Sequence, residues 1–587
     1  MKKRLVFLAI LVIAVLVAGS SVWSGGPQAA TPACPTCEWG ELRGDACTVI
    51  MVGRAASTDG SVMTTHTCDC GLCDWTFRFI PAADHKPEDK RRINRMDQFG
   101  TFPPAIGLKW EKYKDQFSGL EIPEVAHTRA YIHGDFGYMN DRQVSIGEST
   151  IGTVRKLENQ TPTPKFDITT LTMLAMERAS TAREAIKVIG ELAEKYGYGF
   201  TDSGEMLAIA DPKEVWVFEI MPVGPLWTPM SGKPGAVWCA QRVPDDHVSV
   251  CPNESRIGEI DLANKDFFMA STNVVQLAVD MKLYDPKGGK PFNWKRAYSP
   301  SETSAAASGG SRVRMWRFFN LVNPGLALGP ETPNMDFPFS VKADRKISVH
   351  DVMEMTRDKC EGTVFDPARG IQGGPFANPN VLPYGFKLDG KQYNTSRVIG
   401  VNRAEYVTVT QARDWLPDPV GGIVWLAFGA QDTSCFMPLY IGITEIPRSF
   451  EIGDHWEFSR DSARWAFDTV DFHTQVVYNL AIQDVRQAQK KWELSAVNRT
   501  SDVDKTAAEL LKKDPAQASR YLTDYCLNNA TLVVNAWWDL GTQLLVKYNH
   551  LWIYEQNGRK RNPLPLPDAY LKSLVEVNKL KPVEDKK

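Results

Sequence analysis

The sequence has no excess of charge of either sign. Its 587 residues include 67 lysines and arginines against 70 aspartates and glutamates, which gives a formal net charge of -3. A chain balanced in this way has no global field that favours nucleic acid or anionic lipid, so we expect neither as a partner. Internal repeats are missing too, which argues against a helical repeat protein. Substrate choice must therefore come from a local site.

Long apolar runs are missing after the first stretch of the chain. Leu5 to Ala18 is an unbroken apolar run that follows a basic start, Lys2-Lys3-Arg4. This order is typical of a secretory signal peptide, which we place at residues 1–24, with export to the periplasm or the medium. An uncleaved membrane anchor is the alternative, which is less favoured because the run is shorter than the ~20 apolar residues of a spanning helix. We expect no stable membrane span after signal removal.

The remaining composition is that of a folded protein. A hydrophobic share of 43% supports a sizeable core, and 17 tryptophans, 26 phenylalanines and 37 prolines suggest compact, well-packed α/β structure. Residues 25–46 are rich in proline, glycine and small residues, which predicts a propeptide or linker. We divide the rest into a catalytic domain with insertions, 47–450, and a helical C-terminal region, 451–587. Packing of these helices on the body is favoured, and a homo-oligomer is the other option.

Cysteine is plentiful, with eleven residues, and an odd number leaves at least one thiol outside disulfides. Cys34 and Cys37 precede a second cluster formed by Cys68, Cys70 and Cys73. In an exported protein disulfides are the favoured interpretation, and crosslinks between the two groups could hold residues 25–46 over the site. A metal or redox centre is the alternative, but the spacing lacks a second zinc knuckle. We therefore predict no metal and no cofactor.

Cys47 opens the stretch CTVIMVGRAASTDGSVM. Thr48 to Gly53 and Ser61 to Thr67 have the composition of strands, and the turn sequence Ser57 to Gly60 between them predicts a hairpin. If cleavage after Ala46 exposes Cys47, its own α-amine, with an unperturbed pKa of ~7.7 to 8.0, can accept the thiol proton. A buried structural cysteine or a disulfide partner is the alternative.

This stretch, with Asp69 after it, resembles the start of the bacterial dipeptidase A family, relatives of the secernins within the N-terminal-nucleophile hydrolase superfamily. The resemblance continues in YMNDRQVSIGES, GEMLAIADPKEVWVFEI, YDP from Tyr284 and QARDWLPDPVGGIVW, and covers Cys47 to about Tyr440. It implies an α+β protein with a four-layer αββα sandwich, here with a C-terminal helical extension. It also implies thiol-dependent hydrolysis of dipeptides.

The resemblance suggests roles for the residues that follow Cys47. Asp69 would bind the α-amine and stabilise its charged form. Penicillin V acylase and bile salt hydrolase have an arginine where this chain has His66, so His66 either contacts nucleophile or substrate or is a local structural substitution. Glu148 receives no role. Without the resemblance, Asp69 would be a turn-capping residue.

Three further candidates come from the same resemblance. Asn273 and Asn140 are similar to asparagines that orient the amine or face developing negative charge. Arg312, with Arg314 as the substitute, is similar to an active-site arginine. Without the resemblance, the asparagines would be turn residues and the arginines a solvated helix face.

These observations predict an exported cysteine dipeptidase with an autoprocessed N-terminal Cys47 and small peptides as substrates. An amidase of the same fold that acts on N-acyl small molecules such as penicillins or bile salts is one alternative. A cysteine-rich metal or redox binding protein is another, although only His66 and His85 lie near the cysteine cluster. Because the apolar run ends near Ala18, self-cleavage or another protease must remove residues 25–46.

Overall fold

The computed structural model describes residues 37–39, 47–70, 73–94, 117–159, 161, 163–199, 204–301, 310–381, 385–453, 455–555 and 557–583. The chain forms two compact units, one of residues 1–42 with 383–394 and one of residues 43–382 with 395–587. The expected signal peptide lies outside the described residues, as does most of the expected propeptide.

The described part of the smaller unit is an antiparallel sheet of β1 (Cys37–Trp39), β18 (Gly385–Leu388) and β19 (Lys391–Asn394). β18 and β19 form a hairpin whose turn residues Asp389 and Gly390 have φ values of 51° and 74°. Such left-handed pairs suit two-residue hairpins. β1 pairs with β18 from Cys37 opposite Leu388 to Trp39 opposite Phe386. Part of segment 25–46 therefore forms a strand, which its composition did not predict.

Two antiparallel sheets make up the centre of the larger unit in the described part of the chain. One has the strand order β16-β14-β13-β12-β11-β10-β9-β4, and the other has the order β17-β15-β2-β3-β20-β21-β22. The first consists of β4 (Arg78–Ile80), β9 (Tyr131–His133), β10 (Gly137–Asn140), β11 (Ser145–Ile151), β12 (Gly204–Ala210), β13 (Val215–Met221), β14 (Val237–Val243) and β16 (Phe268–Ala270). The second consists of β2 (Val49–Val52), β3 (Val62–Thr67), β15 (His247–Cys251), β17 (Val341–Lys342), β20 (Tyr406–Ala412), β21 (Ile423–Phe428) and β22 (Met437–Tyr440).

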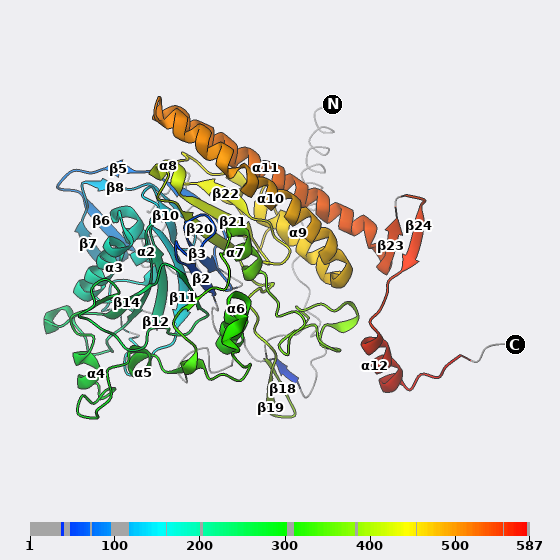
Figure 1. The fold of residues 1–587 in the computed structure, drawn as a ribbon, viewed down its shortest axis with the longest axis horizontal. Coiled ribbons are helices and arrows are strands. Elements are labelled where there is room, and N and C mark those ends of the chain that lie inside the picture. The colour runs from blue at the N-terminus through cyan, green and yellow to red at the C-terminus, as the bar shows by residue number, and fades with distance from the viewer. Residues whose placement is uncertain are drawn as a thin grey trace, which may run out of the picture. The chain divides into compact units, whose positions relative to one another are not determined.

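Helices cover the outer face of each sheet (Figure 1). On the first sheet lie α2 (Ile168–Arg178) and α3 (Ala182–Tyr196). The second sheet is covered by α6 (Gly310–Val322), α7 (Val349–Thr356), α9 (Ala463–Val476) and α11 (Pro515–Lys547), and α10 (Tyr478–Leu511) packs on α9 and α11. The layers thus run helix, sheet, sheet, helix, and the unit is α+β, as expected from the sequence.

Smaller elements lie around these layers. They are β5 (Ala83–Asp84) with β8 (His127–Thr128), β6 (Lys90–Asn94) with β7 (Phe117–Pro123), and β23 (Trp552–Glu555) with β24 (Lys560–Pro563), together with α4 (Gln276–Asp280), α5 (Trp294–Tyr298), α8 (Asp418–Gly421) and α12 (Asp568–Asn578). Among the described helices, we find none that combines the length and the apolar character needed to cross a membrane.

Local sequence signals set the ends of α2 and α3. Asp167 caps α2 by accepting a hydrogen bond from the backbone of Thr170, and Thr181 caps α3 in the same way. Such side chains satisfy amide groups that the first helical turn leaves without partners. Gly197 ends α3 with a φ of 85°, a conformation that glycine adopts without strain. A short break around Ser180 separates the two helices.

The two sheets approach each other closely where β3 faces β11. A Cβ atom on Gly147 would lie 2.2 Å from the carbonyl oxygen of Thr65, so only glycine fits at this point. The next residue on each strand forms a contact between the sheets, because Nδ1 of His66 lies 2.9 Å from the carbonyl oxygen of Glu148. The fold therefore brings His66 and Glu148 together between the sheets.

Candidate functional site

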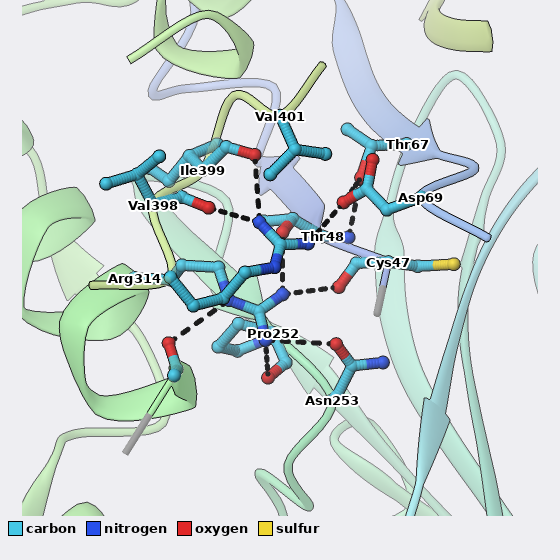
Figure 2. Close-up of polar contacts among 12 residues, drawn as sticks. Cys47, Thr48, Thr67, Asp69, Pro252, Asn253, Arg314, Val398, Ile399 and Val401 are labelled. Carbon is cyan, nitrogen blue, oxygen red and sulfur yellow. Dashed lines mark hydrogen bonds and ion pairs between the residues drawn. The ribbon is translucent and has the colours of Figure 1, made fainter. Parts of the chain in front are cut away.

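Cys47 lies two residues before the start of β2 and is only 3% exposed. Its carbonyl oxygen accepts a hydrogen bond from Nη1 of Arg314 at 2.8 Å and one from the hydroxyl of Ser149 at 3.5 Å. Figure 2 shows the sulfur of Cys47 pointing away from Arg314. The carbonyl group and the thiol of Cys47 thus face different surroundings.

Arg314 lies on α6 and is buried. Its five N–H groups meet five acceptors, which are the carbonyl oxygens of Gly310, Cys47 and Pro252, the Thr48 hydroxyl and the Asn253 side-chain oxygen, at 2.8 to 3.2 Å (Figure 2). Burial and the nearby Arg397 lower the pKa of Arg314, whereas Asp69 raises it. A full set of acceptors keeps a guanidinium ionised in such a place. Arg314 therefore fixes the backbone of Cys47 and Thr48.

Asp69 is the second residue after β3 and is fully buried. Its carboxylate accepts hydrogen bonds from Nη2 of Arg397 at 2.6 Å, from the Thr67 hydroxyl at 3.0 Å and from the Gln431 amide at 3.2 Å. Burial raises the pKa of Asp69, and Arg397 opposes this shift. The Thr67 oxygen also accepts from the backbone N–H of Thr48 at 2.8 Å. Asp69 thus reaches the start of the Cys47 strand through Thr67.

The thiol side of Cys47 is formed by His66 and Glu148. The Cys47 sulfur, one His66 ring nitrogen and one Glu148 carboxylate oxygen all lie within 4.8 Å of one another. Burial lowers the pKa of His66 to about 4, so its ring is neutral near pH 7. The Glu148 carboxylate lies 3.7 Å from Nδ1 of His66 and accepts a hydrogen bond from the Thr150 hydroxyl at 3.1 Å. A thiol, an imidazole and a carboxylate therefore share one buried site.

Aromatic rings surround His66. The ring centres of Phe136, Tyr138 and Tyr406 lie 5.2, 5.6 and 5.8 Å from the imidazole. The hydroxyls of Tyr138 and Tyr406 form a hydrogen bond with each other. This apolar wall is the cause of the lowered His66 pKa, since burial disfavours the charged imidazolium.

Asn140 lies at the end of β10 and supports the helix beside it. Its amide donates to the carbonyl oxygens of Met176 and Ala179 at 2.9 and 2.8 Å, and its oxygen accepts from the backbone of Arg142 and Val144. Both amide hydrogens are therefore used at the end of α2, and the structure does not bring Asn140 to Cys47 as a donor. A turn residue was the alternative interpretation.

Asn273 follows β16 at the edge of its sheet. Three strands separate β16 from β11, where Ser149 contacts Cys47, so four strand spacings of ~4.8 Å place Asn273 roughly 19 Å away across the sheet. Its amide donates to the carbonyl oxygen of Ala236 at 3.1 Å, and the residue lines a separate cavity of about 550 Å³ with Trp227. The structure does not bring Asn273 to the Cys47 site.

Arg312 points away from Cys47, whereas the substitute candidate Arg314 contacts it. Nη1 of Arg312 lies 2.5 Å from a carboxylate oxygen of Glu331, and the Glu331 side chain is 80% exposed. Residues two apart on an α-helix lie about 200° apart around its axis, so the two arginines face opposite directions. Arg314, and not Arg312, is therefore the arginine of this pair that lies at Cys47.

Several residues of the site were missed by sequence reasoning. Arg397 lies 328 residues after Asp69 and has no local motif. Asn253 carried a weak signal, because Cys251 pairs with Val49 in the antiparallel register of β15 and β2. Two residues further along, this register places Asn253 beside Cys47. Correct strand pairing would therefore have found Asn253, whereas Arg397 required the whole fold.

The cysteine cluster after Asp69 contains the disulfide Cys70–Cys73. The sulfur of Cys68 lies within 4.8 Å of both, and the Cys68 side chain is buried. Three sulfur atoms at this spacing could hold a soft metal ion if the disulfide were reduced. The expected disulfides are confirmed for this pair, whereas the suggested crosslinks to Cys34 and Cys37 lie outside the described side chains.

Comparison with known proteins identifies the class as peptide hydrolase. Residues 46–491 match Peptidase family C69, and this match spans most of the chain. The protein therefore belongs to peptidase family C69. The matched region begins one residue before Cys47.

Curated relatives carry the same kind of name. The chain is 27% identical over 422 residues to a probable dipeptidase B of Lactococcus lactis, covering 70% of this chain and 77% of the relative. It is 26% identical over 419 residues to dipeptidase A of Lactobacillus helveticus, covering 69% and 77%. A probable dipeptidase of Latilactobacillus sakei is 24% identical over 505 residues, covering 83% of this chain and 93% of the relative.

Proposed function

We propose that the protein is an exported dipeptidase in which Cys47 becomes the N-terminal residue and acts as the nucleophile. One observation carries this proposal. Cys47 is the second residue of the family match, and its backbone is fixed by a buried arginine while its sulfur lies beside His66 and Glu148. The names of the relatives support dipeptides as substrates.

The proposed reaction begins with transfer of the thiol proton of Cys47 to its own α-amine. The thiolate attacks the peptide carbonyl carbon, the C–N bond breaks, and the α-ammonium returns the proton to the leaving amine. Water then hydrolyses the thioester and releases the first amino acid. Arg314 holds the Cys47 carbonyl, and Asp69 acts on the same backbone through Thr67, so both position the nucleophile.

The proposal includes cleavage at the Ala46–Cys47 bond by the protein itself. The layer order of helix, sheet, sheet and helix supports an N-terminal-nucleophile hydrolase fold, in which such cleavage is expected from the family resemblance. Export rests on the basic and apolar sequence of residues 1–24.

A substrate panel tests the proposal. Purified mature protein and the Cys47→Ala variant are incubated with unmodified dipeptides and with N-acyl amides such as penicillin V and a conjugated bile salt. We expect the native protein to cleave dipeptides and the variant to cleave nothing. Turnover of N-acyl amides alone would show the amidase instead, and bound metal without hydrolysis would favour a cysteine-rich binding protein.

A further inference from the structure

The Glu148 carboxylate is an acidic group placed at the proposed nucleophile. It lies on β11, only 2% exposed, with an oxygen within 4.8 Å of the Cys47 sulfur. The Thr150 hydroxyl donates to one of its carboxylate oxygens at 3.1 Å, and the absence of a side chain at Gly147 lets β11 approach β3. The carboxylate is therefore held in place next to the thiol.

The charged groups around Cys47 divide between its two sides. Arg314 faces the carbonyl oxygen, and Arg397 is paired with Asp69 at 2.6 Å. The sulfur points away from Arg314 (Figure 2). On the sulfur side, the neutral ring of His66 does not compete as a cation for Glu148 near pH 7. A cationic group on the substrate would thus meet a negative charge at the reacting atom.

We infer that Glu148 binds the α-ammonium group of the substrate and restricts the enzyme to substrates with a free amino group next to the scissile carbonyl. The inference deepens the proposed function and rests on it. In a dipeptide, a single Cα separates the ammonium nitrogen from the carbonyl carbon, which fixes their distance at ~2.5 Å.

This distance is compatible with the position of Glu148. A carbonyl carbon ready for attack lies ~3 to 3.5 Å from the sulfur, so the ammonium group lies within ~6 Å of the sulfur at most. A carboxylate oxygen within 4.8 Å of the same sulfur can then form a charge-assisted hydrogen bond with the ammonium group. An N-acyl amide offers an uncharged group there and leaves the buried carboxylate without this bond, which costs about 100-fold or more in kcat/KM.

The experiment compares alanyl-alanine with propionyl-alanine, which has the same shape but lacks the amino group. We measure kcat/KM for both with the native enzyme, with Glu148→Gln and with Glu148→Asp. The matched control is Glu191→Gln, which changes an exposed glutamate on α3. Intact mass confirms a chain that starts at Cys47, and thermal unfolding confirms folding.

We expect the native enzyme and the control to prefer the free dipeptide by about 100-fold or more. In Glu148→Gln this preference should shrink to less than ~10-fold, because only the dipeptide loses a partner, and Glu148→Asp should regain part of it. An unchanged preference in Glu148→Gln, or an equal loss for both substrates, would overturn the inference.

Two outcomes separate this inference from the proposed function. If Glu148→Gln fails to mature, the ratio of kcat/KM for the two compounds with the native enzyme is the test. A native preference below ~10-fold would overturn amine recognition, while dipeptide hydrolysis would stand. A native enzyme that cleaves neither compound nor any other dipeptide would overturn the proposed function and, with it, the role of Glu148.

Discussion

Nη1 of Arg314 lies 2.8 Å from the carbonyl oxygen of Cys47. The same nitrogen also donates to the Thr48 hydroxyl at 2.9 Å, so one buried side chain fixes the first two residues of the proposed mature chain. This contact connects α6 of the outer layer to the beginning of β2 in the sheet below it. The position of the proposed nucleophile therefore depends on a helix residue that lies 267 residues later in the sequence.

Replacement of this arginine should remove both stability and activity. Arg314→Met removes one donor from each of five buried acceptors, and we expect a loss of about 3 kcal/mol in the free energy of unfolding and more than ~100-fold in kcat/KM. The measurements are urea unfolding and dipeptide hydrolysis. Arg312→Met is the control, since its partly exposed ion pair with Glu331 should contribute under ~1 kcal/mol. Equal effects of the two substitutions would contradict the assignment.

His66 should make the fold sensitive to acid. Its pKa is about 4 in the folded protein and ~6.5 in the unfolded chain, so the folded protein binds fewer protons between these values. The stability contribution is fully present above pH ~6.5 and is lost as the pH falls towards 4, by about 2 kcal/mol at pH 5.

The test measures urea unfolding at pH 7 and pH 5 for the native protein and for His66→Asn. The variant should lose about 2 kcal/mol less than the native protein between these pH values. His550→Asn, a change at an exposed histidine, should follow the native protein. A His66→Asn variant with the native pH dependence would show that the pKa of His66 is not lowered in the folded protein.

Local patterns predicted much of the framework. The hairpin predicted after Cys47 appears as β2 and β3, because strand-forming residues and a turn sequence act within a few residues. The α+β class and the family were predicted from the family resemblance that begins at Cys47.

The site was harder to predict, because its residues meet only through the fold. Arg314 and Arg312 belong to one short motif, and the turn of α6 decides which of them is buried. Asn273 was chosen through the family resemblance, but it follows a strand at the edge of its sheet. Glu148 received no role from the sequence, since its importance comes from Gly147 and the close approach of β11 to β3.

A side chain at position 147 should separate the sheets. Gly147→Ala would place a Cβ atom 2.2 Å from the backbone oxygen of Thr65, which cannot move aside as a flexible side chain could. We expect a loss of about 3 kcal/mol or more in the free energy of unfolding, together with loss of activity. The control Gly329→Ala meets nothing within 4 Å and should unfold like the native protein. A stable, active Gly147→Ala variant would contradict this packing.

The cysteine cluster makes a prediction for mass spectrometry. Digestion of unreduced protein should yield a peptide with Cys70 and Cys73 crosslinked, ~2 Da lighter than its reduced form. Cys68 is buried and should react with iodoacetamide only after unfolding. A crosslink from Cys70 or Cys73 to Cys34 or Cys37 would contradict the pairing. Stoichiometric zinc in the purified protein would favour a metal centre.

The most direct test of the central claim determines the N-terminus of the active protein. Intact mass and N-terminal sequencing are combined with a dipeptide assay for the native chain and for Cys47→Ala. We predict an active native chain that begins at Cys47, and an inactive variant that retains residues before position 47. A native chain that hydrolyses dipeptides while Ala46 is still attached to Cys47 would contradict the account, because the α-amine could not then serve as the base.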